Sequence, residues 1–280
     1  MKYLGFYHEG RVRPGIVEGE RVREITCDSL IDYIGIDSRE RARYHGALTV
    51  ALRDARLAAP IRPRKNVFCV GRNYLEHAKE GARAGGRELK LPDVPTFFTK
   101  APTAIADPDA TLELQARISP HYDYEAELAV IIGKTVRDVS EADAFDAVFG
   151  YACLNDLTAR DLQRAHLQWF KGKSLDHSCP IGPWIVGKDD LPNPGRLSIE
   201  LRLNGERRQF SNTSQMIFPI PNLIAELSKG MTLEPGDIIA TGTPDGVGFA
   251  RTPPEFLKDG DVIEIEIAKI GVLRNLIRIT

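Results

Sequence analysis

The sequence contains few cysteines, and no two of them have the spacing of a metal or disulfide motif. Cys27, Cys69, Cys153 and Cys179 are scattered over 280 residues without a CxxC pair, a pattern that argues against a zinc site and against a disulfide framework. We expect Cys69 and Cys153 to be small core residues. Cys179, beside Pro180, is either a further core residue or a thiol near a site.

Long hydrophobic runs, an excess of charge of one sign and internal repeats are also missing. No segment is apolar over the length of a membrane span, and residues 1–15 contain no signal-peptide core. The net charge of −2 and the pI near 6.3 provide no basic field for nucleic acid or anionic lipid. We therefore expect a cytoplasmic globular protein that binds a small molecule, with no nucleic-acid or membrane partner.

The first sixty residues have the pattern of a separate small module. Short strand-like segments (YLGFYHEG, RPGIVEG and ERVREI) alternate with glycine-containing turns, and helices are predicted at 29–34 and 39–58. Two prolines and a basic cluster near 60–64 indicate a connector. We predict a small N-terminal α+β domain over residues 1–62 and a larger domain over 63–280.

The larger domain is rich in short, β-branched segments. Strands are predicted at 66–70, 96–99, 126–132, 181–186, 197–203, 237–240 and 262–267, and helices at 74–80, 141–145, 156–165 and 220–229. The segment 201–208 (LRLNGERR) predicts a hairpin around its Asn-Gly pair. Because strands and long helices do not alternate regularly, we predict a β-rich α+β fold, a sandwich or barrel-like roll, and not a doubly wound sheet.

Two glutamates interrupt an otherwise apolar strand at 122–133 (YDYEAELAVIIG). Glu125 and Glu127 are two residues apart, so they point to the same face as Ala129 and Ile131. Two like charges at the edge of an apolar surface need a shared proton or a bound cation, and a divalent metal is the stronger candidate. The alternative is a strand whose glutamates face solvent or pair with Arg and Lys.

A second segment, 71–81 (GRNYLEHAKEG), follows an apolar strand and carries His77 and Glu80. On a helix these two residues lie on one face, where the carboxylate can hold one imidazole nitrogen and make the other more basic. The pair then has the form of a general base. The alternative is an incidental pair on a surface helix, since exposed pairs of this kind are common and weak.

Three further positions are polar where a core would be apolar. Asp156, after the strand end GYACLN, is either a helix N-cap or a third oxygen ligand. Lys173, in 170–183 (FKGKSLDHSCPIGP), is either a solvated lysine or a group that stabilises substrate charge. Thr243, in 240–249 (ATGTPDGVGF), lies in a glycine-rich loop that offers backbone amides to an anion or forms an ordinary turn.

Together these segments resemble the fumarylacetoacetate hydrolase family, in its bacterial fumarylpyruvate hydrolase or 2-hydroxyhepta-2,4-diene-1,7-dioate isomerase-like members. The resemblance covers about residues 64–280. It rests on segments that occur in the family's order: GRNYLEHAKE (71–80), PTFFTKAPTAI (95–105), DYEAELAVIIG (123–133), GYACLNDLTARDLQ (150–163), GKSLDHSCPIGP (172–183) and GDIIATGTPDGVG (236–248).

The resemblance implies a mixed β-sandwich roll, usually a homodimer, preceded by a small N-terminal domain. It implies Mg²⁺ or Mn²⁺, with Ca²⁺ as an alternative, on Glu125, Glu127 and Asp156. The other site residues that it implies are His77, Glu80 and Lys173 as catalytic groups and Arg160, Gln163, Thr243 and Lys100 as substrate contacts.

An all-oxygen metal site and a His–Glu pair favour hydrolysis of a C–C bond in a 2,4-dioxo acid, which releases pyruvate and a carboxylic acid. The glycine- and charge-rich segment 82–93 would then be a lid. The alternatives are isomerisation or decarboxylation of a 2-oxo or 2-hydroxydienoic diacid, or a ureidoglycolate lyase reaction. A protein that is only braced by Ca²⁺ is a further alternative.

Overall fold

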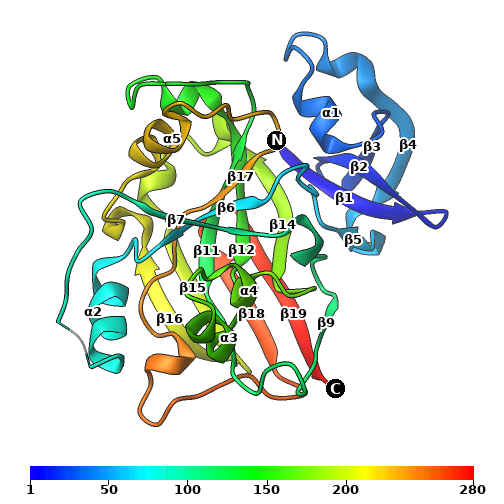
Figure 1. Cartoon of the computed structure of the whole chain (residues 1–280). Helices are drawn as coiled ribbons and strands as arrows, with labels where there is room; N and C mark the ends of the chain where they lie inside the picture. Colours follow the sequence, from blue (N-terminus) through cyan, green and yellow to red (C-terminus); the bar gives the residue numbers. More distant parts are fainter. Residues whose placement is uncertain (87) are drawn as a thin grey trace.

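The computed structural model describes residues 1–86 and 88–280, and two β-sheets make up most of it (Figure 1). The order of the larger sheet is β4-β3-β2-β1-β14-β12-β11-β17-β6-β7, with β5 beside β1 and β8 beside β14. Its strands are β1 (Lys2–His8), β2 (Arg11–Glu18), β3 (Arg21–Ile25), β4 (His45–Ala51), β5 (Leu57–Ala58), β6 (Val67–Gly71), β7 (Thr96–Lys100), β8 (Ile105–Ala106), β11 (Ala126–Ile132), β12 (Val148–Asn155), β14 (Cys179–Gly187) and β17 (Ile238–Ala240).

The second sheet has the order β16-β15-β18-β19-β9, and a short pair, β10-β13, lies apart from both. These strands are β9 (Thr111–Leu114), β10 (Tyr122–Asp123), β13 (Thr158–Ala159), β15 (Ser198–Leu203), β16 (Glu206–Asn212), β18 (Val262–Ile267) and β19 (Gly271–Ile279). The helices are α1 (Leu30–Ile34), α2 (Leu75–Ala84), α3 (Arg160–Ala165), α4 (Phe170–Lys173) and α5 (Ile220–Ser228). In the described residues, no helix is long and apolar enough to cross a membrane.

Strand β11 lies at the centre of the larger sheet and is buried on both faces. Leu128 and Val130 pack toward the five-stranded sheet, in one core with Ile265 and Leu273. Ala129 and its alternate neighbours belong to a second core on the other face. The alternation predicted for this strand is confirmed, and so is the β-rich α+β sandwich roll.

The N-terminal segment continues the larger sheet, because Tyr3 of β1 pairs with Ile185 of β14. Its helix α1 covers the face that carries Ala129, and in Figure 1 the segment (blue) lies at the upper right. Since no observation tests where one domain ends, the division into residues 1–62 and 63–280 stays a prediction.

The helix predicted at 39–58 is wrong. The segment contains two 3-10 turns, at Arg41–Tyr44 and Leu52–Asp54, and between them runs β4, which pairs with β3 at Val22 and Val50. Strand pairing over the small core of Leu4 and Phe6 outweighs the local helical spacing.

Two other helices begin later than predicted. The segment 141–145 contains only the start of a 3-10 turn at Ala144–Ala147. The helix predicted from 156 begins at Arg160, because the residues before it pair with β10 as β13. The hairpin at 201–208 is confirmed, with Asn204 and Gly205 both at positive φ in its turn.

Replacing Leu128 by alanine is expected to lower the free energy of unfolding by about 2–5 kcal/mol, because it opens a cavity between the sheets. Chemical denaturation of Leu128→Ala measures this loss. Leu167→Ala is the matched control, since Leu167 is 93% exposed, and its change should stay within about 0.5 kcal/mol. Equal losses would contradict the assignment of the core.

Candidate metal centre and acid–base pair

Three buried carboxylates meet at one end of the larger sheet. Ala126 of β11 pairs with Asn155 of β12, so Glu125 lies beside Asp156, whose backbone N–H donates to the Glu125 carbonyl oxygen. Glu127 is the second residue of β11 and points to the same face as Glu125. One ligand atom from each of the three carboxylates lies within 4.8 Å of the others. Solvent-facing glutamates are therefore excluded at this position.

Lysine and arginine side chains neutralise two of these carboxylates. Lys173 Nζ lies 2.8 Å from Glu125 Oε2 and 2.7 Å from Asp156 Oδ2, and Lys100 Nζ lies 2.7 Å from Asp156 Oδ1. Burial alone would raise the pKa of Glu125, but Lys173 and Arg160 lower it to about 2. Burial alone would lower the pKa of Lys173, but Asp156 and Glu125 raise it. Glu125 and Lys173 therefore stabilise each other's charged form as an ion pair.

Glu127 has no cationic partner among the described residues. Its Oε2 accepts one hydrogen bond, of 2.8 Å, from the Gly242 backbone N–H. Burial, followed by repulsion from Asp156 and Glu125, raises the pKa of Glu127 well above its ordinary value. A cation beside Glu127 would remove this penalty.

The donor set fits a divalent cation. Three carboxylates form an all-oxygen site, which suits Mg²⁺, Mn²⁺ or Ca²⁺. The neighbouring Tyr74 is 1% exposed, and its hydroxyl has no hydrogen-bond partner among the described residues. A buried polar atom without a hydrogen-bond partner is typical of a site that binds a ligand or water.

Helix α2, at the left of Figure 1, carries the predicted acid–base pair. His77 Nδ1 lies 2.9 Å from Glu80 Oε1, and the two side chains are only 11% and 16% exposed. They therefore do not form an incidental surface pair. Burial raises the pKa of Glu125, while Lys173, Arg160 and, to a smaller degree, His77 lower it, which places the His77 ring in the neighbourhood of the carboxylates.

The glycine-rich loop after β17 binds the protein's own carboxylates. Besides the Gly242 bond to Glu127, the Gly246 backbone N–H lies 3.1 and 2.9 Å from the two carboxylate oxygens of Glu80. Gly246 has φ +100°, and a Cβ there would lie 2.1 Å from the Arg208 carbonyl oxygen. The loop therefore needs glycine at this point, and it fixes the position of Glu80.

Other predicted site residues lie in the same region. Lys173 ends helix α4 and is 2% exposed, so it is not a solvated loop lysine. Asp156 does not cap a helix, because α3 begins four residues later without a side-chain cap. Thr243 is buried, and its hydroxyl accepts from Gln209 Nε2. Gln163 Oε1 accepts from Arg160 Nη1 at 3.1 Å.

Sequence reasoning missed two buried residues that organise the site. Asp123 is fully buried, and its Oδ2 accepts from Arg160 Nε at 2.8 Å. The Asn73 side chain joins the start of α2 to the strand end, donating to the carbonyl oxygen of Thr241 and accepting from the Phe218 backbone N–H. Both lie in segments quoted above, but local sequence does not indicate contacts with residues so far along the chain.

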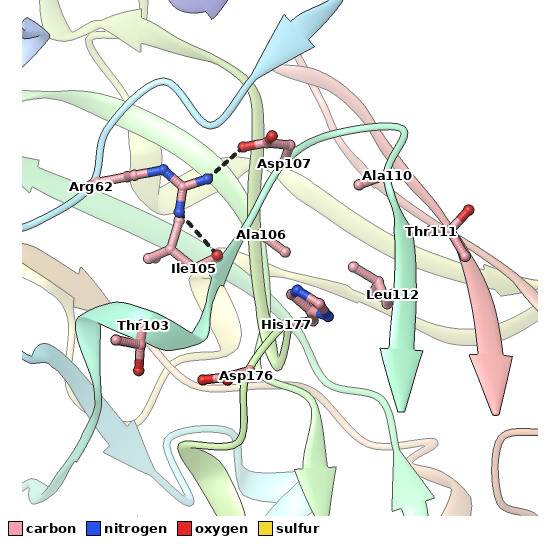
Figure 2. Close-up of a pocket in the computed structure, with 10 residues that line it drawn as sticks. All are labelled: Arg62, Thr103, Ile105, Ala106, Asp107, Ala110, Thr111, Leu112, Asp176 and His177. Carbon is pink, nitrogen blue, oxygen red and sulfur yellow. Dashed lines mark hydrogen bonds and ion pairs between the residues drawn. The ribbon is translucent and has the colours of Figure 1, made fainter. Parts of the chain in front are cut away.

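A separate cavity of about 430 Å³ lies beside the loop that follows Lys173. Figure 2 shows Arg62 bonded to Asp107 and to the Ile105 carbonyl oxygen, with the His177 ring between Ala106 and Leu112. None of the predicted site residues lines this cavity. The predicted lid, 82–93, begins inside α2, and its residue 87 lies outside the described residues.

Residues 66–278 match the pattern of the fumarylacetoacetate hydrolase C-terminal family. The chain belongs to this family. The match covers most of the predicted larger domain and every predicted site residue. Members of the family bind divalent metal, which agrees with the buried carboxylates described above.

The relatives carry several activities in their names. Oxaloacetate tautomerase YisK of Bacillus subtilis is 50% identical over 233 residues, which are 83% of this chain and 76% of that protein. The structure of a fumarylacetoacetate hydrolase from Exiguobacterium antarcticum is 42% identical, with a TM-score of 0.86 over the whole of both chains. A 2-hydroxyhepta-2,4-diene-1,7-dioate isomerase from Mycobacterium marinum is 34% identical, with a TM-score of 0.82 over 100% of this chain and 99% of that one.

A divalent cation is expected to stabilise this family member through Glu127. Mn²⁺ at about one hundred times its dissociation constant should add ~2.7 kcal/mol to the free energy of unfolding, measured as a higher Tm. Glu127→Gln should lose this increase, because a neutral amide is a weak ligand for a hard cation. The control Glu113→Gln, at an exposed position of β9, should retain it. An undiminished increase in Glu127→Gln would contradict the assignment of the site.

In EDTA, the pH dependence of stability should show the raised pKa of Glu127. Because this pKa is higher in the folded than in the unfolded chain, the folded state binds the proton more tightly. The resulting stability is complete below the ordinary pKa and is lost as pH rises through the folded pKa. The difference in Tm between Glu127→Gln and the wild type should therefore shift in favour of Glu127→Gln as pH rises above the ordinary pKa of a glutamate. A constant difference would contradict the shift.

Proposed function

We propose that this protein is a divalent-metal-dependent enzyme that interconverts the keto and enol forms of a small 2-oxo diacid such as oxaloacetate. The observation that carries the proposal is that one glycine-rich loop bonds both Glu80 of the His77–Glu80 pair and Glu127 of the three buried carboxylates. The 50% identity with an oxaloacetate tautomerase supports this reaction, and the isomerase among the structural relatives carries out related proton transfers. The alternative of isomerisation is thus better supported than the hydrolysis predicted first.

Glu125, Glu127 and Asp156 would hold the cation, which supplies a Lewis acid for the 2-oxo group. Glu80 accepts a hydrogen bond from His77 Nδ1, and this bond leaves Nε2 as the proton acceptor. His77 Nε2 would then take the proton from C3 of the keto form, which breaks the C3–H bond and leaves its electron pair in the C2–C3 double bond of the enolate. The imidazolium would return this proton to the 2-oxo oxygen, which forms the O–H bond of the enol and restores neutral His77. The reverse reaction uses the same groups in the opposite order.

The buried cations stabilise the charge that develops on the substrate. Lys173 is 2% exposed and already lies between two carboxylates, so its ammonium group cannot move far as charge shifts. A fixed positive charge in a dry site acts strongly on a developing oxyanion. Arg160 and Gln163, with Thr243 and Lys100, complete the proposed set of groups around the substrate.

Hydrolysis of a C–C bond is the second candidate, because the hydrolase structure is 42% identical over the full chain. The same His–Glu pair would then take a proton from water and not from carbon. A homodimer and a cytoplasmic location also remain proposals, which rest on the family resemblance and the composition.

His77→Ala should lower kcat for oxaloacetate tautomerisation by about 10²–10⁴-fold, because it removes the proton acceptor. The assay follows the ultraviolet absorbance of the enol after EDTA treatment and after Mg²⁺ or Mn²⁺ is restored. His166→Ala, which removes an exposed histidine, is the matched control and should retain wild-type activity.

Pyruvate release from acetylpyruvate or fumarylpyruvate is measured in parallel with the same variants. Metal-dependent tautomerisation without such release would support the proposal. Pyruvate release that His77→Ala abolishes, with no effect on tautomerisation, would replace it by the hydrolase function.

A further inference from the structure

The contacts of the Arg160 guanidinium leave one of its nitrogen atoms, Nη2, without a hydrogen-bond partner among the described residues. Its Nε donates to Asp123 Oδ2 at 2.8 Å, and its Nη1 lies 2.7 Å from Glu125 Oε1. The ring of Phe249 covers the guanidinium, with its centroid 4.4 Å from Cζ. Arg160 is only 3% exposed, yet its Nη2 has no hydrogen-bond partner among the described residues.

Backbone hydrogen bonds prevent Asp123 from also accepting a hydrogen bond from Arg160 Nη2. A carboxylate commonly binds arginine with both oxygens, through Nε and Nη2. Here Asp123 Oδ1 already accepts from the backbone N–H groups of Gly248 and Tyr124, at 2.8 and 2.9 Å. Its Oδ2 also accepts from the Phe249 N–H at 3.1 Å. The backbone thus orients the carboxylate toward Nε alone.

A buried guanidinium nitrogen without an acceptor is costly unless a ligand supplies one. We infer that Asp123 is a positioning residue, which holds Arg160 so that Nη2 stays free for a carboxylate oxygen of the substrate. Asp123 itself does not touch the substrate in this arrangement. The inference rests on the proposed 2-oxo diacid, and it adds Asp123 and the backbone of residues 248–249 to the residues that determine substrate affinity.

The principal test is Asp123→Asn. The asparagine oxygen can keep the bonds to the Gly248 and Tyr124 amides, but its NH₂ group would then face the Arg160 Nε donor. KM for oxaloacetate should rise by about tenfold or more, with kcat changed by less than about threefold, because binding is lost and the proton-transfer groups remain. Malonate binding in the presence of Mn²⁺, measured by calorimetry, should weaken by a similar factor.

A double-mutant cycle distinguishes a role of Asp123 in orienting Arg160 from a purely structural role. Arg160→Gln should raise KM at least as much as Asp123→Asn, and the double variant should be no worse than Arg160→Gln alone. If the two effects on KM multiply, or if Asp123→Asn lowers only the Tm, the inference is overturned. The affinity for Mn²⁺ without malonate should stay within about twofold of wild type in Asp123→Asn, and a larger loss would also overturn it.

Asp107→Asn is the matched control. Asp107 accepts three hydrogen bonds, from the Tyr7 hydroxyl, the Ala59 backbone N–H and Arg62, against four for Asp123, and it lines the separate cavity. It should change stability without changing KM. Should Asp123→Asn fail to fold, Phe249→Leu removes the ring over Arg160 and should raise KM in the same cycle.

These experiments test the proposed reaction and the role of Asp123 independently. If the protein has no tautomerase activity but Asp123→Asn and Arg160→Gln weaken malonate binding non-additively, the proposed reaction is overturned and the role of Asp123 is kept. If the protein is an active tautomerase but the effects of Asp123→Asn and Arg160→Gln multiply, the proposed reaction is kept and the role of Asp123 is overturned.

Discussion

The arrangement of the site depends on the burial of like charges at the end of strand β11. Glu125, Glu127 and Asp156 can share a site of a few ångströms only because Lys100, Lys173 and Arg160 lie within hydrogen-bond distance of two of them. With Asp123, four buried carboxylates face three buried cations, so one carboxylate has no cationic partner among the described residues. This group is Glu127, and its ionised form is the one that burial and the neighbouring carboxylates disfavour. A divalent cation at this point would favour the ionised form of Glu127.

The glycine-rich loop connects this charge balance to the acid–base pair. Its backbone N–H groups bind three carboxylates, Glu80 on α2 and Asp123 and Glu127 in the segment that contains β11. Backbone amides are fixed donors that carry no net charge, so they orient these groups without adding to the cationic side of the site. One loop thereby sets the position of a proposed metal ligand, of the partner of His77 and of the partner of Arg160.

The successes and failures of the sequence predictions have physical causes. Strand β11 was predicted correctly because an alternating pattern over several residues specifies both of its faces. The helix at 39–58 was wrong, because pairing of β4 with β3 decides that segment and local spacing does not report it. The late start of α3 has a similar cause, since the residues before it pair with β10. The roles that motifs predict for the site residues remain predictions, and the structure adds the distances between their side chains.

The sequence by itself determined the fold class, the family and the residue types available to the site, because these depend on local patterns and on motifs in order. Only the tertiary structure decided which cations pair with which carboxylates, that Glu127 has no cationic partner among the described residues, and that Asp123 holds Arg160. These contacts join residues that are 17 to 56 positions apart. Their energies depend on burial and distance, and neither quantity can be obtained from the order of residues alone.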